Sequence, residues 1–336
     1  MSHRRDLHIN WSAQWRGPVP NPSRFRCQLD DQPAFLVPPR LLTHSVSGFA
    51  IGSLIVNPYL WWSRLGNPPT EIVGWTKLAE NFDWRDEAVW ITDQDGEVVL
   101  PFTLGSTYRA LTEDFCRGRS APEGLPSHAL AILEAARILV VPDLEERRRD
   151  EWRSVLADCA RQFQYGYAVV AGLIHPFHLG ELRRYCRYLI RSGRIQLGDG
   201  QSPRRYVAHN ESVAQFFHWQ LSTVVSTIVG EPVKPSYCYL ASYQSGAMLP
   251  RHTDRPQCQF TVTVLVDSSP EPAVASPWPL HLEISSNEIK VYQAIGDGLV
   301  YRGCEIPHYR TTQPSGRTST SIFFHYVPES FRGSLE

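Results

Sequence analysis

One short segment constrains the fold of this chain more than any other: Pro250-Arg251-His252-Thr253-Asp254, which a lone His308 follows much later. Residues two apart on a strand point to the same side, so His252 and Asp254 can face one point while Thr253 faces away. His308 must reach that point from a different strand. Two imidazoles and one carboxylate form the facial triad that holds non-haem Fe(II), with open positions for a co-substrate and dioxygen. The chain therefore has to bring distant strands together, and the pattern indicates oxygen activation.

The segments around these residues are predicted to be strands because they are rich in β-branched and aromatic residues. They lie before the His-x-Asp segment, after it, before His308 and near the C-terminal end: residues 237–246, 259–267, 296–301 and 316–326. Pro307 directly precedes His308, and the third predicted strand ends a few residues earlier. His308 is therefore expected just beyond a turn or bend.

With these motifs, residues 166–328 resemble the Fe(II)/2-oxoglutarate-dependent oxygenases, most closely their prolyl-hydroxylase-like branch. In that family a Tyr-rich strand and a glycine turn lead into His-x-Asp. A Thr-rich strand follows, and a Gly-x-Leu-Val-x run then leads into the distal His. The resemblance implies an α+β chain whose catalytic domain is a double-stranded β-helix, or jelly roll, with flanking helices.

The resemblance also implies a basic residue, about nine or ten positions after the distal His, that binds the far carboxylate of 2-oxoglutarate. Arg317 stands at this interval after His308. A guanidinium is permanently charged and offers a planar fork to a carboxylate. A surface arginine at a strand end is the alternative interpretation. Four nearby hydroxyls can complete the hydrogen bonds to the co-substrate: those of Tyr243, Tyr239, Thr261 and Ser319.

The implied cofactors are Fe(II), 2-oxoglutarate as co-substrate, and O2. Asp254 occupies the position where related halogenases carry a small residue, so hydroxylation or another oxidation is predicted rather than halogenation. The implied reaction converts 2-oxoglutarate to succinate and CO2 while it oxidises a substrate C–H bond. The protein contributes binding, orientation and the exclusion of side reactions.

Length and composition set the context of this domain. A chain of 336 residues can hold two cores, and we predict an N-terminal extension over residues 1–140, with a part in substrate recognition, and an oxygenase domain over residues 141–336. A net charge of −1 gives no general attraction to nucleic acid or to an anionic membrane. Seven scattered cysteines without a Cys-x-x-Cys pair, and no signal peptide, favour a cytoplasmic protein with reduced thiols.

The N-terminal part gives weaker signals. Residues 16–40 are rich in proline and read as an extended arm. The apolar run 41–62 is interrupted by polar residues, so we predict a buried helix rather than a membrane span. Residues 88–100 read as a hairpin around Asp95-Gly96, and residues 127–139 as a helix with Ser127 as N-cap.

Three further helices are predicted, over about residues 143–164, 178–191 and 211–229. The run 147–149 of three arginines reads as a solvated helix face. The polar link around Arg205 reads as a surface loop, with a contact to the mouth of the active site as the alternative.

Two histidines compete with His308 for the third ligand position. His281 alternates with leucines on a strand, and His325 lies in the last strand. His308 is preferred because it follows a turn and precedes a basic residue at the family's interval. Arg255 and Arg310 flank the predicted ligands and are candidates for substrate contact at the rim.

The proline-containing segment 268–278 departs from the family pattern, and loops of this kind often set specificity. Together with the N-terminal extension it favours a peptide, a carrier-tethered amino acid or a related natural product as substrate. The alternatives are an oxygenase acting on nucleic acid and a non-catalytic cupin-like module that binds a metal or small ligand. The oligomeric state is not determined by these residues.

Overall fold

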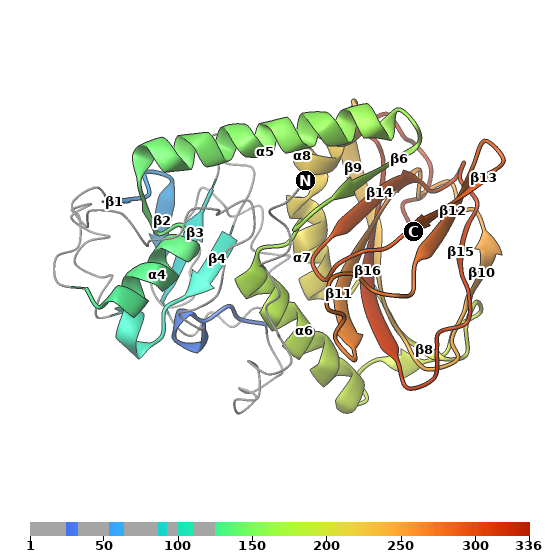
Figure 1. The fold of residues 1–336 in the computed structure, drawn as a ribbon, viewed down its shortest axis with the longest axis horizontal. Coiled ribbons are helices and arrows are strands. Elements are labelled where there is room, and N and C mark those ends of the chain that lie inside the picture. The colour runs from blue at the N-terminus through green and yellow to red at the C-terminus, as the bar shows by residue number, and fades with distance from the viewer. Residues whose placement is uncertain (1–24, 33–53, 64–86, 93–99, 110–124) are drawn as a thin grey trace. The chain divides into compact units, whose positions relative to one another are not determined.

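The computed structural model describes residues 25–32, 54–63, 87–92, 100–109 and 125–336. The chain divides into two compact units (Figure 1). We call the first the C-terminal unit; it contains residues 154–174 and 182–336. The second, the N-terminal unit, contains the described residues up to 153 together with residues 175–181. The predicted division at residue 140 stays a prediction.

Two antiparallel sheets form the C-terminal unit. The larger has the strand order β6-β14-β11-β16-β9-β8-β7, and the smaller has the order β10-β15-β12-β13. The strands of the larger sheet are β6 (Tyr167–Val170), β7 (Gln196–Leu197), β8 (Arg205–His209), β9 (Val233–Tyr243), β11 (Phe260–Ser269), β14 (Gly298–Arg302) and β16 (Thr318–Pro328). Those of the smaller sheet are β10 (Leu249–His252), β12 (Leu280–Ile284), β13 (Asn287–Val291) and β15 (His308–Arg310).

The chain passes from one sheet to the other as it runs from β9 to β16, and only β12 and β13 follow each other within one sheet (Figure 1). This alternation places four strands of the larger sheet, β9, β11, β14 and β16, opposite the four strands of the smaller sheet around a common interior, as in a jelly roll. The predicted double-stranded β-helix is therefore confirmed. The four predicted strands appear as β9, β11, β14 and β16.

The facing sides of the two sheets bury an apolar and aromatic core that includes Leu249, Leu280, Leu282, Leu299 and Phe323. Side chains on a strand alternate between its two faces, and residues paired across antiparallel strands share a face. The pairs Phe323–Tyr239, Ser321–Ala241 and Ser319–Tyr243 join β16 to β9. Because Phe323, Ala241 and Tyr243 belong to the interior core, the two serines face the interior as well.

Two helices of the C-terminal unit, α7 (Ser212–Gln220) and α8 (Ser222–Val229), pack against β9 of the larger sheet. Two longer helices, α5 (Pro142–Phe163) and α6 (Pro176–Arg191), each have residues in both units. The single helix predicted over residues 211–229 is wrong, because the chain breaks at Leu221, whose ψ is −4°. The apolar periodicity of the sequence continues through Leu221, so the sequence pattern gives no sign of this break. Gly230, at φ 83°, ends α8 in the left-handed conformation, as predicted.

The N-terminal unit contains a three-stranded sheet of β2 (Leu60–Ser63), β3 (Ala88–Ile91) and β4 (Leu100–Thr103). Its other elements are η1 (Leu29–Asp31), β1 (Ile55–Val56), α4 (Ser127–Ala135) and β5 (Leu139–Val140). The pairing of β3 with β4 confirms the predicted hairpin, although its Asp95-Gly96 turn lies outside the described residues. Of the predicted arm over residues 16–40, only 25–32 are described.

Two predictions in this unit are wrong. The described part of the run 41–62 forms strands rather than a helix, because Ile55, Val56 and the tryptophans of β2 favour extended backbone. Ser127 is the first helical residue of α4, and Pro126 holds the cap position. Of the helices among the described residues, none is both long and apolar enough to cross a membrane.

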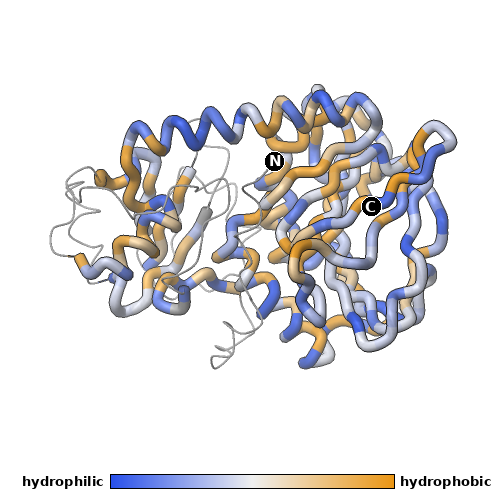
Figure 2. The backbone as a smooth tube through the Cα atoms, viewed as in Figure 1, coloured by the Kyte–Doolittle hydropathy of each residue, from blue (hydrophilic) through white to orange (hydrophobic). Residues whose placement is uncertain are grey.

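The first half of α5 is hydrophilic (Figure 2), yet its arginine run is not a solvated face as predicted. Arg148 and Arg149 are buried beside Glu145, which also pairs with Arg137. The distances from the nearest guanidinium nitrogen to Glu145 Oε1 are 2.5, 2.7 and 3.0 Å for Arg137, Arg148 and Arg149. Burial opposes ionisation, but these guanidinium groups lower the pKa of Glu145 to about 2. One carboxylate thus serves three buried cations.

Candidate metal centre

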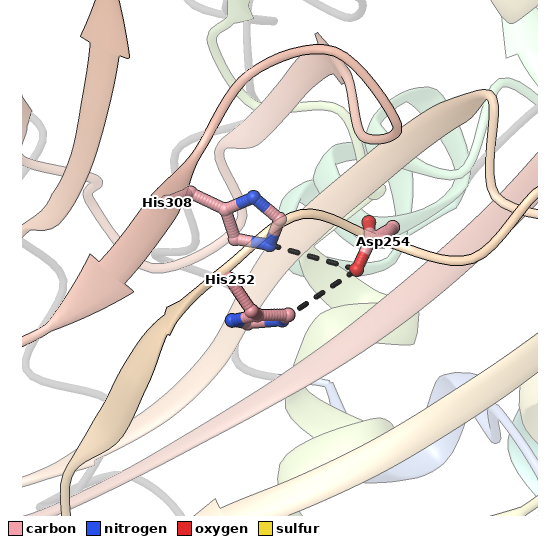
Figure 3. Close-up of side chains that lie close together, drawn as sticks. All are labelled: His252, Asp254 and His308. Carbon is pink, nitrogen blue, oxygen red and sulfur yellow. Dashed lines mark ion pairs between the residues drawn. The ribbon is translucent and has the colours of Figure 1, made fainter.

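The three predicted ligands lie together at one end of the smaller sheet. His252 ends β10, His308 begins β15, and the two residues pair across these strands. Asp254 follows two residues after β10. Its Oδ1 lies 3.6 Å from the Nε2 atom of each histidine (Figure 3). One ligand atom from each residue lies within 4.8 Å of the others, a spacing that a single metal ion can bridge.

A register shift on β10 helps to build this cluster. Leu249 pairs with Arg310 and His252 pairs with His308, so three steps on β10 match two on β15. A bulge of this kind re-aims side chains that strict alternation would separate. As a result both Leu249 and His252 face the interior, where they line the same cavity.

Backbone carbonyls orient both imidazoles. His252 Nδ1 lies 2.8 Å from the carbonyl oxygen of Pro250, and His308 Nδ1 lies 2.9 Å from that of Ile306. A carbonyl only accepts hydrogen bonds, so each Nδ1 carries the proton and each Nε2 keeps its lone pair. This is the arrangement that fixes histidine ligands in metal sites. Both Nε2 atoms therefore present donor lone pairs to the space beside Asp254.

The carboxylate is fixed in the same way. Thr261 Oγ1 donates to Asp254 Oδ2 over 2.8 Å, which leaves Oδ1 on the side of the two histidines. Burial alone would raise the pKa of Asp254, but the neighbouring imidazoles, that of His252 above all, and the hydrogen bond from Thr261 lower it to about 2. The group is therefore an anion at neutral pH, as a metal ligand must be.

Gly303 leaves room for this carboxylate. A Cβ atom at this position would lie 2.5 Å from the Cys258 carbonyl oxygen, 2.7 Å from Thr261 Oγ1 and closer still to Asp254 Oδ2. The Gly303 carbonyl also accepts from the backbone N–H of Asp254 over 2.9 Å. The chain therefore needs glycine here for close approach of the backbone to a side chain.

The two rival histidines differ in position. His281 lies on the outer face of β12, where its ring stacks on Tyr309 at 4.6 Å and its Nδ1 lies 3.2 Å from Glu288 Oε1. His325 is buried beside the cluster, and its Nδ1 lies 3.0 Å from Thr261 Oγ1. It can also form a second group of possible ligands with Asp254 and Cys258. Burial lowers the pKa of His325 to about 4, so this imidazole is neutral.

A cavity of about 290 Å³ opens beside the three ligands. Its wall carries aromatic and apolar side chains from both sheets, with charged residues near one edge: Tyr239, Tyr243, Leu249, Tyr301, Phe323 and Arg205 are among them. A mostly apolar concave site with a few polar groups is typical of small-ligand binding. The ligand cluster therefore faces a space large enough for a co-substrate.

The predicted co-substrate residues take different places. Tyr239 and Tyr243 line the cavity, whereas Thr261 holds Asp254. Ser319 is buried on the interior face, and its hydroxyl has no hydrogen-bond partner among the residues that the structure describes. Arg317 lies just before β16, is half-buried, and is not part of the cavity wall. Its guanidinium forms no ion pair with any described residue.

Two arginines differ from their predicted places. Arg205 belongs to β8 instead of a surface loop; it is buried, and its Nε and Nη2 atoms lie 2.9 and 2.5 Å from Asp199 Oδ2. Arg310 is not at the rim, because it faces the interior and is 3 % exposed. Arg205 also donates to the Tyr243 hydroxyl on β9, and Arg310 contacts Trp278, and local composition does not reveal either contact. Arg255 is exposed and lines the cavity, as predicted for a rim residue.

No protein-family model matches this chain, and no curated protein sequence matches it. Solved structures are similar over about half of it. A Pseudomonas putida prolyl-4-hydroxylase is 17 % identical with a TM-score of 0.43, covering 53 % of this chain and 100 % of that chain. A Trichoplax adhaerens prolyl hydroxylase, solved with a hypoxia-inducible-factor peptide fragment, is 14 % identical with a TM-score of 0.46, covering 54 % and 93 %. HygX from Streptomyces hygroscopicus, solved with nickel and 2-oxoglutarate, is 13 % identical with a TM-score of 0.42, covering 52 % and 87 %.

Half of this chain is thus similar to 2-oxoglutarate-dependent oxygenases. This is the resemblance that the His-x-Asp motif and its flanking strands predicted.

Proposed function

We propose that this protein is an Fe(II)- and 2-oxoglutarate-dependent oxygenase that holds its iron through His252, Asp254 and His308. The observation that supports this most strongly is the orientation of the donor atoms. Two Nε2 lone pairs and one carboxylate oxygen converge, and every one of the three side chains is fixed by a hydrogen bond on its far side. Two histidines and one carboxylate with open positions form the donor set of non-haem Fe(II) oxygenases.

The cavity beside the triad is where a co-substrate would bind. With iron and 2-oxoglutarate in place, the site would couple the conversion of 2-oxoglutarate to succinate and CO2 with oxidation of a substrate C–H bond by O2. The residues of the chain have simpler tasks. Asp254 stays ionised, Thr261 holds it in place, and the aromatic wall formed by Tyr301 and Phe323 limits access of water to the site.

For the substrate we propose an amino-acid residue in a peptide, a carrier-tethered amino acid or a related natural product, which would be hydroxylated at an unactivated C–H bond. Exposed Arg255 and Thr253 lie at the open side of the cavity and can contact such a substrate. The net charge of −1 argues against nucleic acid as the partner. A cytoplasmic location remains part of this proposal.

An anaerobic titration tests the proposal. Addition of Fe(II) and 2-oxoglutarate should produce a weak visible charge-transfer band, and admission of air with substrate should yield succinate. The band should disappear in His252→Ala and Asp254→Ala. His281→Ala is the matched control, because this histidine belongs to the same sheet but faces outward, and it should retain the band.

The outcomes separate the proposal from its rival. Folded wild-type protein that shows neither band nor succinate would refute the enzyme. Iron binding without the band and without turnover would instead support a cupin-like binding module. Loss of the band in His281→Ala as well would show that the iron does not bind at the proposed triad.

A further inference from the structure

Arg310 points into the jelly roll from the strand that carries a proposed iron ligand. It lies two residues after His308 on β15, so both side chains share the inner face, while Tyr309 between them stacks on His281 outside. Arg310 also pairs with Leu249, which lines the cavity. Its guanidinium therefore lies on the interior side of the smaller sheet, beyond the triad.

None of the carboxylates in the described part of the chain pairs with this guanidinium. Its Nη1 donates to the carbonyl oxygen of Trp278 over 2.7 Å, and its central carbon lies 4.9 Å from the centroid of the Trp278 ring. Its Nε is buried without a hydrogen-bond partner. Among the described residues the other buried arginines all have a carboxylate: Arg183 has Asp267 and Glu271, Arg205 has Asp199, and Arg137, Arg148 and Arg149 have Glu145. Arg310 is the exception within that set.

A buried cation without a counter-ion is unfavourable, because desolvation is not repaid by pairing. Proteins therefore rarely bury a guanidinium alone. The core that contains Trp278, on which the Arg310 guanidinium rests, also contains the aromatic rings of Tyr243 and Tyr301. This part of the interior is thus a place for an anion that none of the described residues supplies.

The larger sheet presents hydroxyl groups to the same interior. Tyr243 lines the cavity, and its ring lies 5.1 Å from the ring of Trp278, on which Arg310 rests. Ser319 pairs with Tyr243 across β16 and β9, and its buried Oγ has no partner. Buried polar groups normally find partners. The unpartnered hydroxyl and the unpartnered Nε therefore border one interior region, around Tyr243 and Trp278.

Distance also favours this region for the co-substrate. Two residues along a strand span about 6.6 Å, which suits a five-carbon dicarboxylate held at one end by the metal and at the other by a cation. Leu249, Tyr301 and Phe323 form an apolar wall for the methylene groups between the two ends. Neither arginine belongs to the cavity wall itself, but Arg310 is buried on the inner face beside Leu249, which does, whereas Arg317, at the interval of the family, is only half-buried just before β16.

We infer that Arg310, rather than Arg317, binds the distal carboxylate of 2-oxoglutarate, with Ser319 as a hydrogen-bond donor. The inference rests on the proposed function for the identity of the dicarboxylate. A guanidinium fork and a carboxylate form charge-assisted hydrogen bonds that are about twice as strong as neutral ones. Arg310 is thus a binding residue for the co-substrate, supplied by β15 instead of β16.

The test compares two ligands on Ni(II)-loaded protein by calorimetry, so that no turnover is needed. One ligand is 2-oxoglutarate, and the other is 2-oxopentanoate, which keeps the chelating end and replaces the distal carboxylate by a methyl group. Wild-type protein should prefer 2-oxoglutarate by about 30-fold or more. Arg310→Gln should abolish this preference, whereas its affinity for 2-oxopentanoate and for Ni(II) should change by no more than about threefold.

Three other variants complete the comparison. Arg317→Gln should keep the preference for 2-oxoglutarate. Arg310→Lys should keep part of this preference, and this variant provides a second test if Arg310→Gln does not fold. Arg251→Gln is the matched control, since this arginine also neighbours a proposed ligand but pairs with Glu283 on the exposed side of the sheet. If Arg317→Gln loses the preference and the Arg310 variants keep it, the inference is overturned but the proposed function is not. Wild-type protein that binds Ni(II) but neither 2-oxoacid would overturn the proposed function and the inference with it.

Discussion

Replacement of Gly303 by alanine tests how closely the backbone must approach the metal ligand. The added Cβ would meet the Cys258 carbonyl oxygen at 2.5 Å and Thr261 Oγ1 at 2.7 Å, and it would come closer still to Asp254 Oδ2. Contacts below 3.0 Å force a shift. The Gly303 backbone cannot move freely, because its N–H donates to the Gln259 carbonyl and its own carbonyl accepts from Asp254.

The expected size of the effect follows from which atoms can yield. The carbonyl of Cys258 is backbone, so the carboxylate of Asp254 and the hydroxyl of Thr261 must shift instead. Overpacking of this kind typically lowers the free energy of unfolding by about 1–3 kcal/mol. Disturbance of the groups that orient a ligand typically lowers metal affinity by about 10–100-fold. We therefore expect Gly303→Ala to fold less stably and to bind Fe(II) about 10–100-fold more weakly.

Two measurements separate these effects: an anaerobic Fe(II) titration against a chromogenic chelator, and urea unfolding followed by circular dichroism. Gly298→Ala is the matched control at the start of β14, the strand that Gly303 follows, since its Cβ would meet Leu173 Cδ2 at 2.5 Å, away from any ligand. It should lose stability without losing Fe(II) affinity in the folded protein. Wild-type Fe(II) affinity in Gly303→Ala, or equal losses in both variants, would refute the reasoning.

Three further changes have defined outcomes. Thr261→Val removes the donor to Asp254 at nearly constant volume and should weaken Fe(II) binding about tenfold in the same titration. Glu145→Gln leaves three buried arginines without their carboxylate and should cost about 3–5 kcal/mol in urea unfolding at pH 7. Because the pKa of Glu145 is lowered to about 2, its stabilisation is complete above its ordinary pKa and is lost as pH falls toward 2, and the variant should lack this acid-dependent loss. Burial raises the pKa of Glu134 to about 8, so wild-type stability should fall as pH rises from about 4.5 to 8, and Glu134→Gln should flatten this slope in melting temperatures measured at pH 5 and pH 8.

Short-range sequence patterns were enough to predict the strands and the residues of the ligand cluster, whereas the jelly roll was implied by the resemblance to 2-oxoglutarate-dependent oxygenases. The interior strands were predicted from their β-branched and aromatic residues, and β9, β11 and β16 confirm these predictions. The spacing of His252 and Asp254 follows from alternation on a strand, although Asp254 proves to lie just after β10. The position of His308 beyond a turn distinguished it from His281, which the structure places on the outer face.

The sequence could not predict which arginine side chains are buried. Arg148, Arg205 and Arg310 were expected in solvent or at a rim, since arginine is usually exposed. Arg148 and Arg205 are buried against nearby carboxylates, those of Glu145 and Asp199, and Arg310 is buried against the ring of Trp278. Composition alone does not show that these contacts form inside the fold. The bulge on β10 was equally hidden, because alternation alone would turn Leu249 away from His252.

The register of β15 is therefore the feature on which the site depends most. This three-residue strand presents His308 and Arg310 to the interior and Tyr309 to the outside, and it is held on both sides, by β10 and by β12. Leu282 pairs with His308 from β12, and Leu249 pairs with Arg310 from β10; both leucines belong to the interior core. A slip of one residue would reverse every side chain of β15 and would move the proposed iron ligand and the buried cation to the surface together. The apolar residues that fix this register thus position the two ends of the co-substrate site at once, which explains how so short a strand can supply both.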